Sequence, residues 1–290
     1  MAKIEVKNLK KSYNSNLVLD DINIVFDENK IYGLLGRNGA GKTTLLNIIT
    51  NRIFQDNGVV EVDGENVREN DNALEKIYFM TERNLFPESY TVKKILKWTS
   101  EFYKNFHMEY ALELAKKFEL DINKKMKNLS TGYCSIAKII IAMASGAEII
   151  IFDEPVLGLD ANHRELFYKE LMKNYIDEPK TIILSTHIIE EVSNIIENVV
   201  ILNDRSIVNT EDAEELLNKV YTVSGLSENV DKYIKAKEIV NIEALTNFKA
   251  ATVLGEICSE DKKLAEELGL EFSKVELQKL FIYLTSKEEK

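Results

Sequence analysis

A glycine-rich loop between an apolar segment and a helical segment constrains the fold of this chain more than any other feature. Residues 31–35 are apolar and predict a strand, residues 42–50 predict a helix, and residues 36–43 fit the pattern GxxxxGK[ST] at every specified position. Glycines let backbone N–H groups converge on an anion, and the start of the helix adds a partial positive charge. This order predicts a P-loop, with Lys42 near the β- and γ-phosphates of a nucleotide and the Thr43 hydroxyl on Mg²⁺. The predicted nucleotide-binding residues are Gly36, Arg37, Asn38, Gly39, Ala40, Gly41, Lys42, Thr43 and Thr44.

Two adjacent acids follow a second apolar strand. Residues 149–152 lead directly into Asp153 and Glu154, and ligands collect at the carboxyl ends of buried parallel strands. In P-loop NTPases the first acid supports Mg²⁺, a role that fits Asp153. Glu154 could take a proton from an attacking water. A third apolar strand, residues 181–184, leads to His187, which could bond the γ-phosphate or the water.

The composition excludes several classes of protein. The chain has 290 residues, 45% of them hydrophobic, so it can bury a sizeable core without disulfides. Its 37 basic and 48 acidic residues give a charge of −11, and an acidic surface repels nucleic acid and anionic membranes. No apolar stretch reaches the roughly 20 residues of a membrane span, and the N-terminus has no signal-peptide core. We expect a cytosolic chain without a nucleic-acid partner, whose Cys134 and Cys258 stay reduced.

The pattern of the remaining segments predicts that the chain has a large domain followed by a small appendage. Residues 3–6 and 22–26 alternate between apolar and polar side chains, as half-buried strands do. Helical periodicity dominates from about residue 91 to residue 147. Beyond about residue 220 the pattern changes to acidic helical pieces and short strands. We expect an α/β domain over residues 1–220, with a helical insert at about 91–147, and a small α+β appendage over residues 221–290.

Five motifs occur in a fixed order along the first 220 residues. They are the P-loop, Leu129-Ser130-Thr131-Gly132-Tyr133, Ile151-Phe152-Asp153-Glu154-Pro155, Gly158-Leu159-Asp160 and Ser185-Thr186-His187. Together they resemble the ATP-binding subunit of a bacterial ABC transporter of the exporter type. The resemblance implies a P-loop NTPase ABC cassette with a mixed sheet, an antiparallel β subdomain and the helical insert. It also implies ATP as the nucleotide, which the P-loop pattern alone does not distinguish from GTP, together with Mg²⁺ and ATP hydrolysis.

The resemblance adds further site residues. Tyr13 would stack on adenine, and Leu159 and Asp160 would belong to the contact between two chains. Residues 129–133 are similar to the family signature LSGGQ, which binds the γ-phosphate held by the opposite subunit. A serine hydroxyl, a glycine N–H and a helix dipole suit that anion. The signature segment consists of Leu129, Ser130, Thr131, Gly132 and Tyr133.

Two regions depart from the family pattern. Thr131 stands where the signature has its first glycine, and Tyr133 stands where it has glutamine. Because Ser130 and Gly132 are retained, we expect function to persist, with a looser dimer. Thr81 falls where the family usually has a glutamine that contacts Mg²⁺ and water, with Glu82 next to it, and a side-chain oxygen of either residue could substitute for that glutamine.

These features support one hypothesis of function and leave two alternatives. ATP would close a pair of chains, either two copies or one copy with a paralogue, and hydrolysis would open it. The pair would power transport through separate membrane permease subunits, docked near residues 91–98 at the cytoplasmic face of the membrane. A resemblance of residues 185–191 to exporter cassettes favours export, while the cargo is unreadable. The alternatives are a soluble ABC ATPase acting on nucleic acid or ribosomes, and a regulatory module without turnover.

Overall fold

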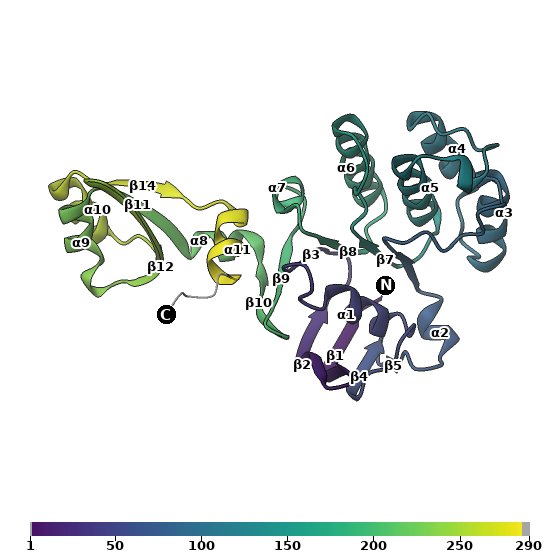
Figure 1. Cartoon of the computed structure of the whole chain (residues 1–290), viewed down its shortest axis with the longest axis horizontal. Helices are drawn as coiled ribbons and strands as arrows, with labels where there is room; N and C mark the ends of the chain where they lie inside the picture. Colours follow the sequence, from purple (N-terminus) through teal and green to yellow (C-terminus); the bar gives the residue numbers. More distant parts are fainter. Residues whose placement is uncertain (1, 286–290) are drawn as a thin grey trace. The chain divides into compact units, whose positions relative to one another are not determined.

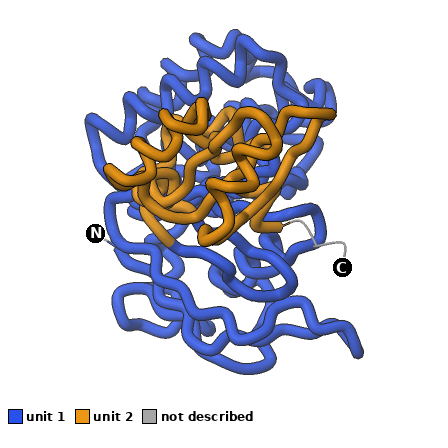
Figure 2. Tube along the Cα trace, turned by 90° about the vertical axis from the view of Figure 1, so that its left-hand side faces the viewer, with its two compact units in different colours: residues 1–187, 200–210 blue, residues 188–199, 211–290 orange. Residues whose placement is uncertain are grey.

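The computed structural model describes residues 2–285, and the chain divides into two compact units (Figure 1, Figure 2). The first unit consists of residues 1–187 and 200–210, and the second of residues 188–199 and 211–290. The chain therefore enters the second unit, returns to the first and leaves it again. The predicted domain bounds at residue 220 stay a prediction.

A four-stranded antiparallel sheet in the order β2-β1-β4-β5 forms one layer of the first unit (Figure 1). β1 and β2 form a hairpin in which Tyr13 pairs with Asn16, and Asn14 in the turn has φ 54°, which asparagine tolerates. Both strands run on to this turn, so they are longer than the predicted segments 3–6 and 22–26. The bounds are β1 (Ile4–Tyr13), β2 (Asn16–Phe26), β4 (Asn57–Val62) and β5 (Glu65–Asn66).

A six-stranded sheet in the order β10-β9-β3-β8-β7-β6 carries the predicted P-loop strand at its centre. β3, β7 and β8 are buried at every position, as their continuous apolar runs predict. β3, β8, β7 and β6 pair in parallel, so their carboxyl ends meet at one edge: Leu35 is level with Thr186, and Asp153 with Ser185. The bounds are β3 (Ile31–Leu35), β6 (Ile77–Met80), β7 (Ile149–Asp153), β8 (Thr181–Thr186), β9 (Asn198–Asn203) and β10 (Ser206–Asp212).

Apart from α2, which the sequence analysis did not predict, the helices of the first unit occupy the predicted stretches. The part of the chain from about residue 91 to 147 is helical, and its last helix, α5, is buried from Ser135 to Ala144 because its residues there are apolar on almost every side. Ser130 and Asp160 cap the starts of α5 and α6 with their side chains. The bounds are α1 (Lys42–Ile49), α2 (Asp71–Leu74), α3 (Val92–Phe102), α4 (Met108–Lys117), η1 (Met126–Asn128), α5 (Thr131–Ala144) and α6 (Ala161–Asp177).

The second unit is a separate α+β fold with its own core. From residue 220 its elements follow the order βαββαβ, and the sheet order β12-β13-β11-β14 makes it a split βαβ arrangement. Its core contains Tyr221, Val223, Tyr233 and Val253. Across residues 2–285, no helix combines the length and apolarity needed to span a membrane. The bounds are α7 (Ile189–Val192), α8 (Ala213–Asn218), β11 (Val220–Leu226), α9 (Ser227–Tyr233), η2 (Ile234–Ala236), β12 (Glu238–Leu245), β13 (Phe248–Leu254), α10 (Ser259–Leu268), β14 (Glu271–Lys274) and α11 (Leu277–Thr285).

Candidate functional site

The P-loop connects β3 to α1, and its surroundings require two of its glycines. Gly41 precedes α1 with φ 107°, and a Cβ there would lie 2.8 Å from the side chain of Leu19. A Cβ on Gly36 would lie 2.8 Å from the carbonyl oxygen of Leu202 on β9. The backbone therefore keeps this path only with glycine at both positions.

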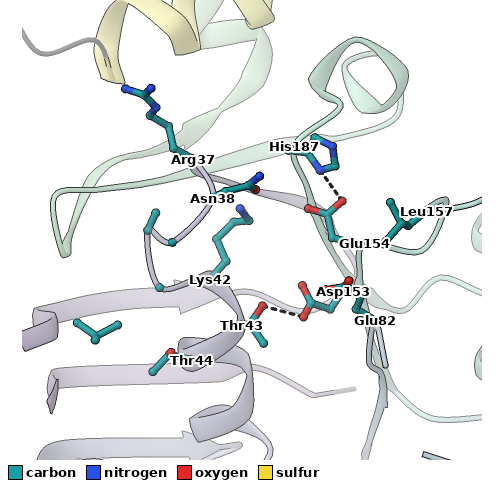
Figure 3. Close-up of a pocket in the computed structure, with 14 residues that line it drawn as sticks. Arg37, Asn38, Lys42, Thr43, Thr44, Glu82, Asp153, Glu154, Leu157 and His187 are labelled. Carbon is teal, nitrogen blue, oxygen red and sulfur yellow. Dashed lines mark hydrogen bonds and ion pairs between the residues drawn. The ribbon is translucent and has the colours of Figure 1, made fainter. Parts of the chain in front are cut away.

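Lys42 and Thr43 are the first residues of α1 and line the same pocket (Figure 3). Lys42 is 7% exposed, and its Nζ donates a hydrogen bond to the carbonyl oxygen of Gly36 at 2.6 Å. Burial lowers the pKa of Lys42, while the nearby carboxylates of Glu154 and Asp153 act to raise it. Because a buried ammonium gains from a neighbouring anion, this position suits a phosphate oxygen.

Asp153 ends β7 with a side chain that two hydroxyl groups orient. Its Oδ2 accepts a hydrogen bond from Thr43 Oγ1 at 2.9 Å, and its Oδ1 accepts one from Ser185 Oγ at 2.9 Å. Burial raises the pKa of Asp153, and the two hydroxyl groups act to lower it. A carboxylate beside a hydroxyl offers the hard oxygen ligands that suit Mg²⁺. Sequence analysis included Ser185 in the motif Ser185-Thr186-His187 but gave it no role of its own, and its place near the end of a buried strand is a second signal.

Glu154 and His187 form a pair next to this carboxylate (Figure 3). The Nδ1 of His187 lies 2.9 Å from Oε2 of Glu154, and Thr186 Oγ1 donates to the same oxygen at 3.4 Å. The backbone at Glu154 has φ 51°, and its N–H donates to the carbonyl oxygen of Ser185 at 2.8 Å. The hydrogen bond to Ser185 on the neighbouring strand holds the backbone of Glu154 in this uncommon conformation, and His187 and Thr186 hold its carboxylate.

These groups line one pocket with a volume of about 460 Å³. The pocket joins the P-loop to the carboxyl ends of β7 and β8, as the sequence predicts. It also includes Val18 from β2 and Leu157, which sequence reasoning missed because neither belongs to a motif that signals phosphate chemistry. The lining residues are Val18, Arg37, Asn38, Gly39, Ala40, Gly41, Lys42, Thr43, Thr44, Glu82, Asp153, Glu154, Leu157 and His187.

Of three other predicted site residues, one lines the pocket and two do not, within the described part of the chain. Glu82 lines the pocket, whereas Thr81 donates its hydroxyl to the carbonyl oxygen of Arg83 at 2.8 Å. Tyr13, at the end of β1, is 47% exposed, and Nζ of Lys11 lies 5.4 Å from its ring centre. Within residues 2–285, Tyr13 is not among those that line the pocket. The geometry favours Glu82 over Thr81, and the role of Tyr13 stays a prediction.

The signature segment, residues 129–133, begins α5 and does not line the pocket within the described part of the chain. The Oγ of Ser130 accepts a hydrogen bond from the N–H of Tyr133 at 3.3 Å. A Cβ on Gly132 would lie 2.6 Å from the carbonyl oxygen of Gly158, so this glycine permits a close approach of two backbones. Thr131, which replaces a glycine of the family pattern, is exposed.

The two predicted dimer residues precede α6. Leu159 is 4% exposed, so its side chain is packed inside its own chain. Asp160 accepts a hydrogen bond from the backbone N–H of His163 at 2.9 Å, and its side chain is 65% exposed. The hydrogen bond from this N–H, together with one from the His163 ring, lowers the pKa of Asp160. Asp160 therefore presents a charged carboxylate to solvent.

Comparison with known proteins gives concordant matches. The family model described as "ABC transporter" matches residues 19–157. The chain is 30% identical over 261 residues to "ABC transporter ATP-binding protein YtrB" of Bacillus subtilis, covering 90% of this chain and 89% of that protein. It is 30% identical to "Bacitracin transport ATP-binding protein BcrA" of Enterococcus faecalis, covering 84% and 80%. It is 29% identical to "Petrobactin import ATP-binding protein YclP" of Bacillus subtilis, covering 82% and 96%.

Solved structures show the same fold. The "Dimeric Structure of MJ0796, a Bacterial ABC Transporter Cassette" matches with a TM-score of 0.65 and 26% identity, covering 72% of this chain and 98% of that one. A post-hydrolysis state of the same cassette, bound to ADP and Pi, matches with a TM-score of 0.64. The predicted fold class is confirmed. The chain belongs to the ABC transporter family, as an ATP-binding subunit that hydrolyses ATP to power transport.

Proposed function

We propose that ATP and Mg²⁺ bind in the P-loop pocket, with Lys42 on the β- and γ-phosphates and with Thr43 and Asp153 holding the metal. The observation that carries this proposal is the 2.9 Å hydrogen bond between Thr43 and Asp153, because it brings the hydroxyl of the P-loop and the carboxylate of β7 to one point. Bound Mg²⁺ would neutralise phosphate charge during hydrolysis. The P-loop N–H groups and Lys42 would orient the phosphates.

Glu154 directs the attacking water, and His187 positions Glu154 and senses the γ-phosphate. The support is geometric: His187 Nδ1 and Thr186 Oγ1 both reach Oε2 of Glu154, so the other carboxylate oxygen has a fixed direction in the pocket. A carboxylate oriented in this way can align water and accept its proton. Tyr13 stacks on adenine, a role that its exposed ring allows.

Two chains act together, each completing the other's site with its signature segment. The support is that residues 129–133 present a capped helix start outside their own chain's pocket, where an anion from elsewhere can approach. The likeness to a cassette of dimeric structure agrees with this arrangement. Asp160, exposed beside the signature segment, contributes to the contact, whereas Leu159 does so only through its backbone because its side chain is buried.

The test compares Glu154→Gln with Lys42→Ala in the purified full-length chain. Glu154→Gln is expected to bind ATP, lose at least about 100-fold in turnover and dimerise in ATP, because only the water-directing carboxylate is neutralised. Lys42→Ala is expected to lose nucleotide. Lys180→Ala is the matched control, since Lys180 is 5% exposed and pairs with Glu178 away from the pocket. Turnover of Glu154→Gln at the native rate would refute the assignment.

The partners are integral membrane permease subunits, which place the chain at the cytoplasmic face of the membrane. Residues 1–220 form the ATPase domain, and residues 221–290 form an accessory domain.

For the direction of transport we propose export, supported by the resemblance of residues 185–191 to exporter cassettes. Relatives named for bacitracin transport and for petrobactin import match at similar identity, so import is the second candidate. Co-purification identifies the permease, and ATP-driven uptake into inside-out vesicles that contain it indicates export. Stimulation of turnover by DNA or ribosomes instead would favour the soluble ATPase, and binding of ATP without turnover the regulatory module.

A further inference from the structure

Within the part of the chain that the structure describes, His163 does not line the P-loop pocket, yet its ring contacts Phe118, Tyr133 and Asp160. It stacks on Phe118, with ring centres 6.2 Å apart and an interplanar angle of 15°. It meets the ring of Tyr133 edge-on, with centres 5.8 Å apart and an angle of 67°. Its Nδ1 lies 3.0 Å from Oδ2 of Asp160. The imidazole therefore connects the signature segment to the residues that precede α6.

The side chain of His163 is not needed to begin α6. Asp160 caps the helix by accepting a hydrogen bond from the backbone N–H of His163, which almost any residue would donate. The bond from Nδ1 is additional, and it places the proton of a neutral imidazole on Nδ1 because a carboxylate only accepts. With both oxygens bonded, an exposed carboxylate is held in one orientation. The imidazole thus fixes the orientation of the Asp160 carboxylate and is not needed for the helix to form.

Short contacts already join the signature segment to residues 157–160, which we call the 157–160 loop. Gly132 approaches the carbonyl oxygen of Gly158 too closely for a Cβ. Just beyond the signature segment, Ser135 of α5 donates its Oγ–H to the carbonyl oxygen of Leu157 at 3.0 Å. Close packing of this kind transmits a shift of one segment to the other. Tyr133 adds an aromatic contact to His163 that the amide of the family's glutamine could not make.

We propose that His163 is a positioning residue for ATP turnover: it fixes the carboxylate of Asp160 and the ring of Tyr133, so that the signature segment and the 157–160 loop meet the partner chain as one body. This inference rests on the proposed function, in which both segments face a second chain. His163 is not among the described residues that line the nucleotide pocket. Loss of its bond to Asp160 therefore slows turnover by the pair and leaves the nucleotide affinity of a single chain unchanged.

The experiment separates the ring of His163 from its hydrogen bond. His163→Phe keeps an aromatic ring against Phe118 and Tyr133 but removes the donor, whereas His163→Asn removes the ring and keeps a donor near the position of Nδ1. We measure kcat and KM for ATP, ADP affinity and Tm of the full chain. His107→Phe is the matched control, because His107 is exposed and begins α4 without a side-chain cap.

The expected result is a fall in kcat of about three- to tenfold for His163→Phe, the range that one partly exposed hydrogen bond supports. For the same variant, KM and ADP affinity are expected to stay within twofold of the native values, and Tm within about 2 °C. His163→Asn is expected to recover at least half of the lost kcat. Any other pattern overturns the inference, including a native kcat for His163→Phe or an asparagine variant no better than phenylalanine. A wild-type chain without ATP turnover would instead count against the proposed function.

Discussion

The hydroxyl of Ser185 is expected to set the Mg²⁺ requirement of hydrolysis. Ser185 is fully buried, and its Oγ donates to Oδ1 of Asp153 at 2.9 Å. Ser185→Ala changes little volume, so its effect isolates the loss of one hydrogen bond to a carboxylate that is itself 2% exposed. Such a bond to a charged group is worth roughly 1.5–3 kcal/mol. The bond also exists without the metal, so this energy sets an upper limit on the change in affinity. At about 1.4 kcal/mol per tenfold, we expect a loss of apparent Mg²⁺ affinity of up to roughly 10- to 100-fold, the range typical of groups that orient a metal ligand.

The sign of the accompanying pH effect follows from the same bond. Burial raises the pKa of Asp153, and the hydrogen bond from Ser185 is one of the interactions that hold it down. Without that bond the pKa rises further, so the carboxylate is protonated over a wider acidic range and binds Mg²⁺ less well there. The acidic limb of the ATPase profile is therefore expected to move to higher pH in Ser185→Ala.

The assay is ATPase rate against free Mg²⁺ at several pH values. Ser145→Ala is the matched control, because Ser145 is also fully buried but donates to the carbonyl oxygen of Ala142 at the end of α5. A Ser185→Ala variant with the native Mg²⁺ dependence and the native acidic limb would refute the reasoning. An equal change in Ser145→Ala would show that lost stability, rather than the proposed role of Asp153 as a metal ligand, is responsible.

Four further substitutions test other parts of the structure. Gly132→Ala places a Cβ against the carbonyl oxygen of Gly158, so we expect it to cost about 1–3 kcal/mol in the free energy of unfolding, measured by urea titration, and to slow ATP turnover. Glu82→Gln is expected to raise the Mg²⁺ concentration needed for half-maximal ATPase, while Thr81→Val is expected to leave it unchanged because its hydroxyl bonds to backbone. For Asp261, burial acts to raise the pKa, but hydrogen bonds from Lys237 and the N–H of Cys258 bring it down to about 2. That stabilisation is present above its unfolded pKa of about 3.9 and is lost as the pH falls toward about 2. Asp261→Asn is thus expected to lower the free energy of unfolding by roughly 1–2 kcal/mol at pH 7 and by much less at pH 2, and equal losses at both would contradict the assignment.

The features that the sequence predicted well are local ones. The strand before the P-loop and the strand before Asp153 are short apolar runs buried on both faces, and such runs are legible without tertiary information. The P-loop could be predicted because its backbone adopts positive φ angles that favour glycine, and the glycines are visible in the sequence. The sequence also placed Glu154 and His187 near the ends of strands of one parallel sheet, whose carboxyl ends share one edge, but it did not predict the contact between the two side chains.

The features that were missed depend on register and on distant segments. Ser185 became part of the site only because β8 pairs with β7 at the level of Asp153. Leu159 lies in a motif that implied a surface contact, yet packing buries its side chain. The contact between His163 and Tyr133 joins two helix starts thirty positions apart, and no local pattern reports it. No local sequence pattern indicates that residues 188–199 belong to the second unit, because their place depends on contacts with distant residues.

The order of strands in the central sheet has a consequence for synthesis of the chain. β3, which ends at the P-loop, lies between β8 and β9, so both of its neighbours come from residues 181 to 203. A nascent chain emerging from the ribosome therefore carries a finished P-loop sequence long before the strands that support it exist. Pairing over such separations is slow and leaves apolar strands exposed in the meantime. A ribosome-bound chain arrested before residue 181 is expected to bind no ATP, and one whose first 210 residues have cleared the exit tunnel is expected to bind it.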